Sequence, residues 1–365
     1  MIIDPKTRLE IIYHNLLAQI SGEEIVRSTV EFEENILLLP DDPIDLKRFS
    51  RIFVCGAGKA SVSMATGLLE VLEDRCDGGL VITKKGDSQR LFGVKVLEAA
   101  HPVPDESSLE AGERMLEFAT RTRSDDLVVF CLSGGASALM ESLREGWNLE
   151  MLADMTQTLL RSGADISAIN LARKGASRLK AGGLGKAFGD ATVRVLVMSD
   201  VQGNPLDVIG SNPFGSLRHH ILADNGTALR LLGGEPDFVT GEAQDVARHM
   251  VDAMTEPGLY IWGGEPTVVV RGRGVGGRCQ EVALAAAIYL QGRENVAFLA
   301  GSTDGTDGPT DLAGAVVDGD TAREDAERHL AANDSGTYFD RYGGAIHTGP
   351  TGCNLNDIFL GWVGA

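Results

Sequence analysis

A short apolar segment that stops at a glycine turn and continues as a helix is the feature that most constrains this chain. Residues 52–55 are typical of a buried strand, Gly56-Ala57-Gly58 interrupts it, and a helical pattern starts at Lys59. The free N–H groups and the dipole of a helix start attract an anion, and Lys59 adds a positive charge. Because the same pattern also occurs as an ordinary turn beside a surface lysine, it indicates an anion site only together with other segments.

The unit of strand, turn and helix recurs along much of the chain. The patterns predict further strands at 80–83, 94–99, 127–132 and 194–198, and helices at 106–121, 148–162 and 165–180. Strands that alternate with helices form a parallel sheet, and the carboxyl ends of its strands converge on one edge, where ligands bind. Ser133-Gly134-Gly135-Ala136-Ser137 follows one of these strands, so it belongs to that edge together with Gly56 and Gly58.

The pattern changes near residue 257. Helices are predicted at 5–20, 224–232 and 241–254, then strands at 259–262 and 267–270 joined by a Gly-Gly turn, a helix at 280–290, a strand at 295–300 and a helix at 321–332. We therefore place a boundary at about 255. This gives an N-terminal domain of residues 1–255 with a parallel sheet and a smaller C-terminal α/β domain of residues 256–365.

The charge of the chain restricts its partners. A formal net charge of −19 disfavours a nucleic acid or an anionic membrane surface. The stretch 166–189 is an exception because it contains basic residues and no acid; the basic residues are Arg173, Lys174, Arg178, Lys180 and Lys186. A local basic cluster of this kind suits an anionic substrate.

Cysteine usage and hydropathy favour a cytoplasmic protein. The five cysteines include no CxxC pair, so neither a disulfide framework nor a zinc site is indicated. The N-terminus has no basic region followed by an apolar stretch, and no apolar run approaches about 20 residues. We therefore expect neither a signal peptide nor a membrane span.

Further charged groups lie where phosphoryl transfer could use them. Arg278 starts a predicted helix after a Gly- and Arg-rich loop, and Asp200 ends a strand of the parallel sheet. Asp304 and Asp307 lie in an acidic, Gly-containing loop whose oxygen ligands suit Mg²⁺. Each group also has a simpler interpretation: a solvated charge for the arginine, an N-cap or turn for Asp200, and a solvated turn for the acidic loop.

Several familiar motifs do not match. The turn at 56–61 has Ser61 where the dinucleotide fingerprint needs a third Gly, and the next strand ends without the acid that would hold a ribose. It is not a Walker A loop either. Residues 177–180 have the spacing SxxK, but the companion elements of the penicillin-binding enzymes are missing. The broken dinucleotide fingerprint disfavours an NAD(P)H-dependent reductase.

A series of short motifs occurs along the chain in order. They are Gly-Ala-Gly-Lys-Ala (56–60), His-Pro-Val-Pro-Asp (101–105), Leu-Ser-Gly-Gly-Ala-Ser-Ala-Leu (132–139), Asn170 with Arg173-Lys174, Met-Ser-Asp-Val (198–201), Gly-Gly-Glu-Pro-Thr (263–267), Gly-Gly-Arg-Cys-Gln-Glu (276–281), Ser-Thr-Asp-Gly-Thr-Asp-Gly-Pro-Thr (302–310) and Gly-Pro-Thr-Gly-Cys-Asn-Leu-Asn-Asp (349–357). Together they resemble the glycerate 2-kinases with a MOFRL-type C-terminal domain, some of which carry the older label hydroxypyruvate reductase. The resemblance spans almost the whole chain.

The resemblance implies a Rossmann-like N-terminal domain, a smaller mixed α/β C-terminal domain and an active site in the cleft between them. It implies an ATP- and Mg²⁺-dependent transfer of a phosphoryl group to the 2-hydroxyl of D-glycerate, which gives 2-phosphoglycerate. By motif position Lys59, Asp200 and Arg278 take the catalytic places. Lys59 and Arg278 would neutralise charge, and Asp200 would orient the hydroxyl or take its proton.

The same motifs supply the expected binding residues. For nucleotide and acid they are Gly56, Gly58, Ser133, Gly134, Gly135, Ser137, Arg173, Lys180 and Glu281, with Asp304 and Asp307 as metal ligands. The expected partners are ATP and a small hydroxy acid rather than a nucleic acid or a membrane. A homodimer is compatible with this interpretation.

The chain departs from the family pattern at positions that concern the acid. Residues 182–185 are Gly-Gly-Leu-Gly where the family usually has Gly-Gly-Arg-Leu, and residues 211–214 are Ser-Asn-Pro-Phe where it has Ser-Gly-Pro-Thr. Much of the helical segment that usually follows Asp200 is missing. A related hydroxy acid as substrate, an NAD(P)H-dependent 2-oxoacid reductase and a non-catalytic ligand-binding member therefore stay open as alternatives.

Overall fold

The computed structural model describes residues 4–162 and 166–365, and the chain forms two compact units. The middle unit contains Ser21–Leu222, and the terminal unit combines Met1–Ile20 with Ala223–Ala365. The division therefore precedes the predicted boundary at about 255, and the first helix joins the C-terminal part of the chain. Asp165, with which one predicted helix begins, lies outside the described residues.

The middle unit is built on a six-stranded sheet in the order β6-β5-β4-β7-β8-β9. Its strands are β4 (Arg51–Ala57), β5 (Gly78–Lys84), β6 (Val94–Ala99), β7 (Asp126–Ser133), β8 (Thr192–Met198) and β9 (His219–Ala223). The pairings among β4 to β8 are parallel, as predicted. The chain leaves β4 toward β5 and β6 and returns to the other side of β4 with β7, which is the Rossmann-like order. The switch point thus lies between β4 and β7.

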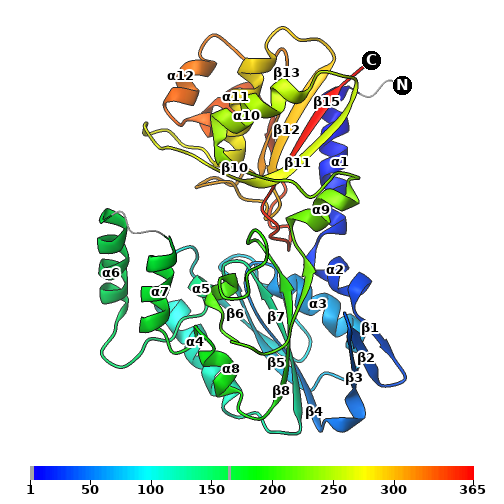
Figure 1. The fold of residues 1–365 in the computed structure, drawn as a ribbon, viewed down its shortest axis with the longest axis vertical. Helices are drawn as coiled ribbons and strands as arrows, with labels where there is room; N and C mark the ends of the chain where they lie inside the picture. Colours follow the sequence, from blue (N-terminus) through cyan, green and yellow to red (C-terminus); the bar gives the residue numbers. More distant parts are fainter. Residues whose placement is uncertain (1–3, 163–165) are drawn as a thin grey trace. The chain divides into compact units, whose positions relative to one another are not determined.

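Helices cover both faces of this sheet (Figure 1). The helices of the unit are α2 (Gly22–Thr29), α3 (Ser61–Leu72), α4 (Glu106–Ala119), α5 (Ala136–Leu139), α6 (Leu149–Arg161), α7 (Ile166–Ala176) and α8 (Gly183–Ala187), with short 3-10 helices at Leu46–Arg48 and Ile209–Ser211. α3 packs on one face, and α4, α5 and α8 pack on the other. Every residue of β7 is buried, as expected for a central strand covered on both sides. A small antiparallel sheet contains β1 (Glu31–Glu33), β2 (Ile36–Leu39) and β3 (Asp42–Asp45).

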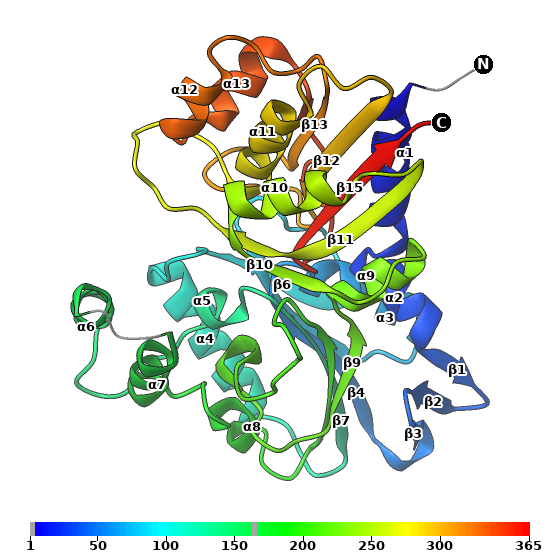
Figure 2. The same cartoon turned by 45° about the horizontal axis from the view of Figure 1, so that its top comes forward.

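The terminal unit has a mixed sheet in the order β10-β11-β15-β12-β13-β14. The strands are β10 (Phe238–Glu242), β11 (Gly258–Thr267), β12 (Val296–Ser302), β13 (Gly314–Asp318), β14 (Ala345–Ile346) and β15 (Asp357–Val363). β10 pairs with β11 in parallel, and the other pairings are antiparallel. The helices are α1 (Pro5–Gln19), α9 (Asn225–Leu231), α10 (Ala243–Ala253), α11 (Arg278–Leu290), α12 (Ala326–Ala331) and α13 (Ser335–Tyr342). α10 to α13 cover one face and α1 covers the other (Figure 2).

The first helix belongs to the terminal unit because its apolar face matches that sheet. Leu9, Tyr13 and Leu16, which predicted an amphipathic helix, are buried. The Tyr13 hydroxyl donates to the carbonyl of Ser302 at 2.6 Å. A side chain on the neighbouring Gly301 would meet the Tyr13 ring at 2.6 Å, so glycine is needed for this close approach.

The predicted hairpin with a Gly-Gly turn near residue 263 is wrong. β11 runs through both glycines as a single strand, and residues 268–270 lie outside any strand. A Cβ on Gly263 would lie 2.1 Å from the Asn225 side chain, and one on Gly264 would lie 2.0 Å from the carbonyl of Val239. The glycines therefore serve close packing inside the sheet and not a turn.

Two predicted helices are shorter than expected. The helix predicted at 165–180 ends at Ala176, and Leu179 is buried in the turn that follows. The helix predicted at 321–332 begins only at Ala326. Within residues 4–162 and 166–365, no helix combines the length and the apolar character needed to cross a membrane.

Candidate active site

The glycine turn after β4 and the serine-glycine loop after β7 are joined at the switch point of the parallel sheet. The N–H of Lys59 donates to the carbonyl of Gly134 at 2.9 Å, and the N–H of Ala60 donates to Ser133 Oγ at 3.0 Å. Gly58 has a φ of 134°, and a Cβ there would lie 2.2 Å from Ser133 Oγ. Only glycine allows this approach, so the predicted cluster of Gly58, Ser133 and Gly134 is brought together.

The side chains of Lys59 and His101 lie beside Gly135. A Cβ on Gly135 would lie 3.0 Å from His101 Cδ2 and 3.4 Å from Lys59 Cγ, and the φ of this glycine is 86°. Lys59 itself is half-buried. His101 was not among the predicted site residues, although its motif carried the family resemblance. Its position after β6 on the same sheet was the available signal.

Asp200 and Ser137 also lie at the carboxyl edge of the sheet. Asp200 follows the end of β8 and is half-buried, and Ser137 lies in α5, directly after the serine-glycine loop. Ser137 Oγ is 2.9 Å from Ser211 Oγ, so the loop after Asp200 meets the loop after β7. Ser211 was not among the predicted site residues, although residues 211–214 were noted as a departure from the family pattern that concerns the acid.

The basic stretch 166–189 is neutralised in part, because Arg178 and Lys180 pair with carboxylates. Arg178 Nη1 lies 2.9 Å from Glu113 Oε1, and Lys174 Nζ donates to the carbonyl of Asp207 at 2.7 Å. Among residues 4–162 and 166–365, Arg173 forms no ion pair and is half-buried. Of the two residues in this stretch that were predicted to bind an anion, Arg173 and Lys180, Arg173 is therefore the one whose charge can attract a ligand.

Lys180 does not fit its expected contact with the acid substrate. The side chain is only 2% exposed, and its ammonium group is hydrogen-bonded to the buried carboxylate of Glu141. Burial lowers the pKa of Lys180, and the charge of Glu141 opposes this shift. Ser177 Oγ also donates to Glu141, at 2.5 Å. The buried partner, far away in the sequence, makes Lys180 part of the core.

Arg278 of the terminal unit is held by two carboxylates. Its Nε and Nη2 donate to Asp357 at 2.6 and 3.1 Å, and its Nη1 donates to Glu265 Oε1 at 2.7 Å. The Asp357 side chain is fully buried, whereas that of Glu265 is 47% exposed. Burial lowers the pKa of Arg278, but the nearby carboxylates outweigh this and raise it. The guanidinium is therefore a fixed positive charge whose Nη1 faces the more exposed partner.

Asp307 caps the helix that starts at Arg278. Its two oxygens accept the N–H groups of Cys279 and Gln280 at 3.1 and 2.8 Å, and a Cβ on Gly277 would lie 2.2 Å from its Cγ. The carboxyl group is buried. Burial and the neighbouring Asp357 raise its pKa to about 7, although the two amide bonds oppose the shift. Asp307 is thus committed to the helix and does not fit the expected role of a Mg²⁺ ligand.

The other predicted metal ligand has a different environment. Asp304 is half-buried, and its Oδ1 accepts the N–H of Thr306 at 2.9 Å and the hydroxyl of Ser302 at 3.0 Å. Over the described ranges, no group of three or more His, Cys, Asp or Glu side chains is placed to hold a metal ion. A single carboxylate such as that of Asp304 is compatible with Mg²⁺, which is often bound by one or two carboxylates together with water and substrate phosphates.

The Gly- and Arg-rich loop before Arg278 is not a phosphate cradle. The N–H groups of Arg271 and Gly272 donate to Asn333 Oδ1 at 2.7 and 2.9 Å. A Cβ on Gly272 would lie 2.0 Å from the carbonyl of Ala332, and one on Gly274 would meet Asp334. The glycines thus allow close packing on the segment between α12 and α13, and the amides already have partners.

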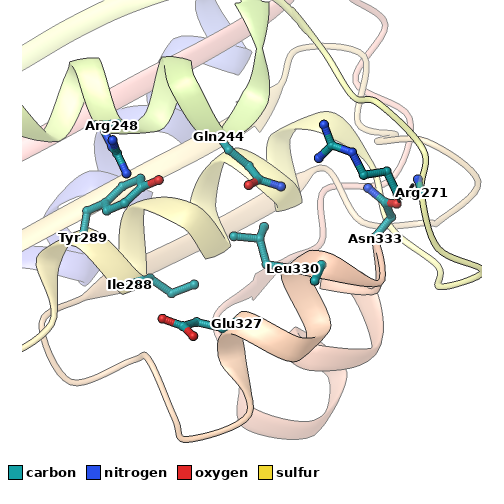
Figure 3. A pocket seen from close by; sticks show the side chains of 9 residues that line it. Gln244, Arg248, Arg271, Ile288, Tyr289, Glu327, Leu330 and Asn333 are labelled. Atoms are coloured by element: carbon teal, nitrogen blue, oxygen red, sulfur yellow. Dashed lines mark hydrogen bonds between the residues drawn. The ribbon is translucent and has the colours of Figure 1, made fainter.

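Glu281 braces the wall of a cavity on the outer face of α11. It accepts hydrogen bonds from Gln244 Nε2 at 3.2 Å and from Asn333 Nδ2 at 3.1 Å, and burial raises its pKa. Both amides line a cavity of about 370 Å³ (Figure 3). Figure 3 shows Arg248 against the ring of Tyr289 in the same cavity, with the guanidinium carbon 5.0 Å from the ring centre. The Glu281 carboxylate is therefore held by two neutral amides.

Each of the two units contains most of a region that matches a known protein family. The model described as a domain of unknown function, DUF4147, matches residues 8–221, and the MOFRL family model matches residues 258–357. D-glycerate 2-kinase of Thermotoga maritima is 34% identical, with 93% of this chain and 97% of that protein aligned. A putative hydroxypyruvate reductase of Agrobacterium vitis is 32% identical over 84% of this chain and 86% of that protein. The crystal structure of glycerate kinase from Thermotoga maritima has a TM-score of 0.83 and 32% identity, and covers 98% of this chain and 99% of that chain.

Proposed function

Since this chain belongs to the family of glycerate 2-kinases with DUF4147 and MOFRL domains, we propose that it transfers the γ-phosphoryl group of ATP to the 2-hydroxyl of D-glycerate or a related small hydroxy acid. The product with D-glycerate is 2-phosphoglycerate. The observation that carries the proposal is the pair of joined loops at the switch point, where Lys59 and Gly134 are bonded at 2.9 Å. A lysine at the carboxyl ends of the strands of a parallel α/β sheet suits an anionic ligand such as a chain of phosphates.

Three residues carry the proposed chemistry. Lys59 neutralises charge that develops on the transferring phosphoryl group. Asp200 orients the substrate hydroxyl and accepts its proton as the new bond to phosphorus forms. Arg278 supplies a second positive charge. Lys59 and Asp200 belong to the middle unit and Arg278 to the terminal unit, so the proposal requires residues of both units to act on one substrate. The cleft expected between domains stays a prediction.

The ion pairs of Arg278 indicate which of its atoms meets the substrate. Asp357 is buried and bonded to two nitrogens, so that side of the guanidinium is fixed. Glu265 is half exposed, and an ion pair of such exposure is worth only about 0–1 kcal/mol. A phosphoryl or carboxylate oxygen can therefore replace Glu265 at Nη1 at small cost, while Asp357 keeps the group in place.

Magnesium would neutralise the phosphates of ATP when bound, with Asp304 as the protein ligand that fits. Asp307 suits this role less well, because both of its oxygens already accept amide hydrogen bonds at the start of α11. Arg173, with no ion pair in the described part of the chain, is the group proposed to attract the carboxylate of the acid.

One assay separates the proposal from its alternatives. The protein is incubated with ATP, Mg²⁺ and D-glycerate, four-carbon sugar acids or glycerol, and ADP release is followed. Release that depends on the acid supports a kinase, and ³¹P spectroscopy of the product distinguishes transfer to the 2-hydroxyl from transfer to the 3-hydroxyl. Oxidation of NADH with hydroxypyruvate would instead indicate a reductase. Stabilisation by ATP without turnover in either assay would indicate a binding protein.

A further inference from the structure

A strained turn lies in the loop between β8 and β9. Gly210, Ser211 and Asn212 have φ angles of 56°, 63° and 54°, so three consecutive residues are left-handed although only the first is glycine. The facing segment is similar, because Ala181 and Gly182 have φ angles of 52° and 82°. Residues other than glycine disfavour this conformation, because their Cβ atom comes too close to the backbone. Such strain persists where the surroundings determine the backbone.

Hydrogen bonds and buried side chains surround this turn. Ala181 N donates to the carbonyl of Ser211 at 3.1 Å, and Gly182 N donates to the carbonyl of Asn212 at 2.7 Å. Phe214, which follows the turn, is 2% exposed and belongs to the core under the parallel sheet. The segment after Asp200 is therefore a packed wall of the middle unit, although it is short.

The buried ion pair of Lys180 and Glu141 anchors the facing segment. Glu141 follows α5 closely, and Lys180 directly precedes Ala181. The pair thus links the end of the helix that contains Ser137 to the backbone that binds Ser211. Since both charges are buried, breaking this link would be costly, so it favours keeping the two segments together.

The two serines form a hydroxyl pair with one hydrogen to spare. Ser137 Oγ and Ser211 Oγ are 2.9 Å apart, and their mutual bond uses one of their two hydroxyl hydrogens. In the part of the chain that the structure describes, neither hydroxyl has another partner. Ser211 is 7% exposed and Ser137 is half-buried, so Ser137 is the more exposed member of the pair. A donor polarised by its neighbour suits an anionic oxygen.

We propose that Ser137 and Ser211 together contact an anionic oxygen of a substrate, and that the strain at Ser211 serves to place its hydroxyl. The inference rests on the proposed kinase reaction. Glycine at this left-handed position would remove the steric cost but also the hydroxyl, so the proposed contact gives a reason for serine here. The anionic oxygen belongs either to the carboxylate of the acid or to a phosphate of ATP, and the experiment below distinguishes these sources.

Ser211→Gly is the decisive variant, since it removes the hydroxyl and relieves the strain at the same time. We expect a Tm equal to or above that of the wild type, together with a loss of activity of about tenfold to a hundredfold, as for a lost hydrogen bond to a charged group. A loss in kcat/KM for the acid at saturating ATP assigns the contact to the carboxylate. A loss in kcat/KM for ATP at saturating acid assigns it to a phosphate.

Two further variants complete the design. Ser137→Ala removes the partner hydroxyl and should reduce the same kinetic constant as Ser211→Gly. Asp41→Gly is the matched control, because Asp41 is also left-handed at a φ of 55°, exposed, and located in the turn between β2 and β3. It should raise or preserve Tm without changing either kinetic constant.

The outcomes separate this inference from the proposed function. If Ser211→Gly is as stable as the wild type and equally active toward both substrates, the turn is structural and the inference is overturned. If the wild type does not turn over, the proposed function fails, and the hydroxyl pair is judged by binding instead. The rise in Tm with ATP or D-glycerate should then be smaller for Ser211→Gly than for the wild type, and an equal rise with each would overturn the inference.

Discussion

Asp357 holds the Arg278 guanidinium through two nitrogens, at 2.6 Å from Nε and 3.1 Å from Nη2, while its own side chain is fully buried. The two groups therefore depend on each other for stability as well as for position. Removing the arginine alone would leave a buried carboxylate without its counter-charge. Arg278→Ala can therefore lose activity in two ways: through the lost positive charge at the site and through lower stability. An experiment must separate the two.

We expect Arg278→Ala to lower kcat/KM by roughly a hundredfold or more and to lower the free energy of unfolding by about 3–5 kcal/mol. The double variant Arg278→Ala with Asp357→Asn removes the buried charge, so it should recover part of the stability but none of the activity. Urea unfolding and steady-state kinetics on both proteins check this. Recovery of activity in the double variant would show that Arg278 acts only through folding.

Lys59→Ala should also lower kcat/KM by roughly a hundredfold or more, because it removes a charge proposed to act on the phosphoryl group. Since Lys59 is only half-buried, its removal should change the Tm little. Lys85→Ala is the matched control, because Lys85 follows the neighbouring strand β5 but pairs with the exposed Asp105 at 2.7 Å. Equal kinetic losses in both variants would argue against a specific role of Lys59.

Lys180→Met should destabilise the protein by about 3–5 kcal/mol, because Glu141 would be left charged and buried. The double variant Lys180→Met with Glu141→Gln should be more stable than Lys180→Met, since glutamine carries no charge and can still accept the hydrogen bond of Ser177. Chemical unfolding of the three proteins measures the difference. A double variant no more stable than Lys180→Met would contradict the buried pair.

Asp307 should make stability depend on pH. Its pKa is about 7 in the folded chain and about 3.9 when unfolded, so the folded state binds the proton more tightly. Its contribution is fully present below about pH 4 and is lost as the pH rises to about 7, by an amount on the order of 4 kcal/mol. Asp307→Asn cannot titrate, so the wild type should lose stability relative to this variant between these pH values. Parallel curves for the two proteins would contradict the raised pKa.

Local sequence patterns predicted much of the middle unit. The strands of its parallel sheet could be predicted because buried central strands are short, apolar and bounded by glycine. The joining of the two loops at Lys59 and Gly134 also followed from the rule that strand ends converge. What such patterns lack is the identity of a distant partner. An amphipathic first helix shows which face it buries, but not that β12, β13 and β15 will cover it.

The errors at individual residues have the same origin. Lys180 looked like a free charge because Glu141 lies 39 residues before it. Gly263 and Gly264 suggested a turn, because glycine serves both tight turns and close packing and the sequence alone does not distinguish them. Asp307 was expected to bind metal because it lies in an acidic loop. The sequence does not show that its carboxylate accepts N–H groups at the start of α11, where Cys279 lies 28 residues before it.

The association of α1 with the terminal unit has a consequence for biosynthesis. Helix α1 is made before the middle unit but packs against β15, which is made after it, and Arg8 of α1 stacks on Trp362 of β15 at 4.3 Å from the ring centre. The middle unit can finish folding while the chain is still being made, but α1 must wait with Tyr13 uncovered until β15 has been made. We expect nascent chains stalled before residue 357 to expose this helix to chaperones and proteases, even though the parallel sheet is already formed.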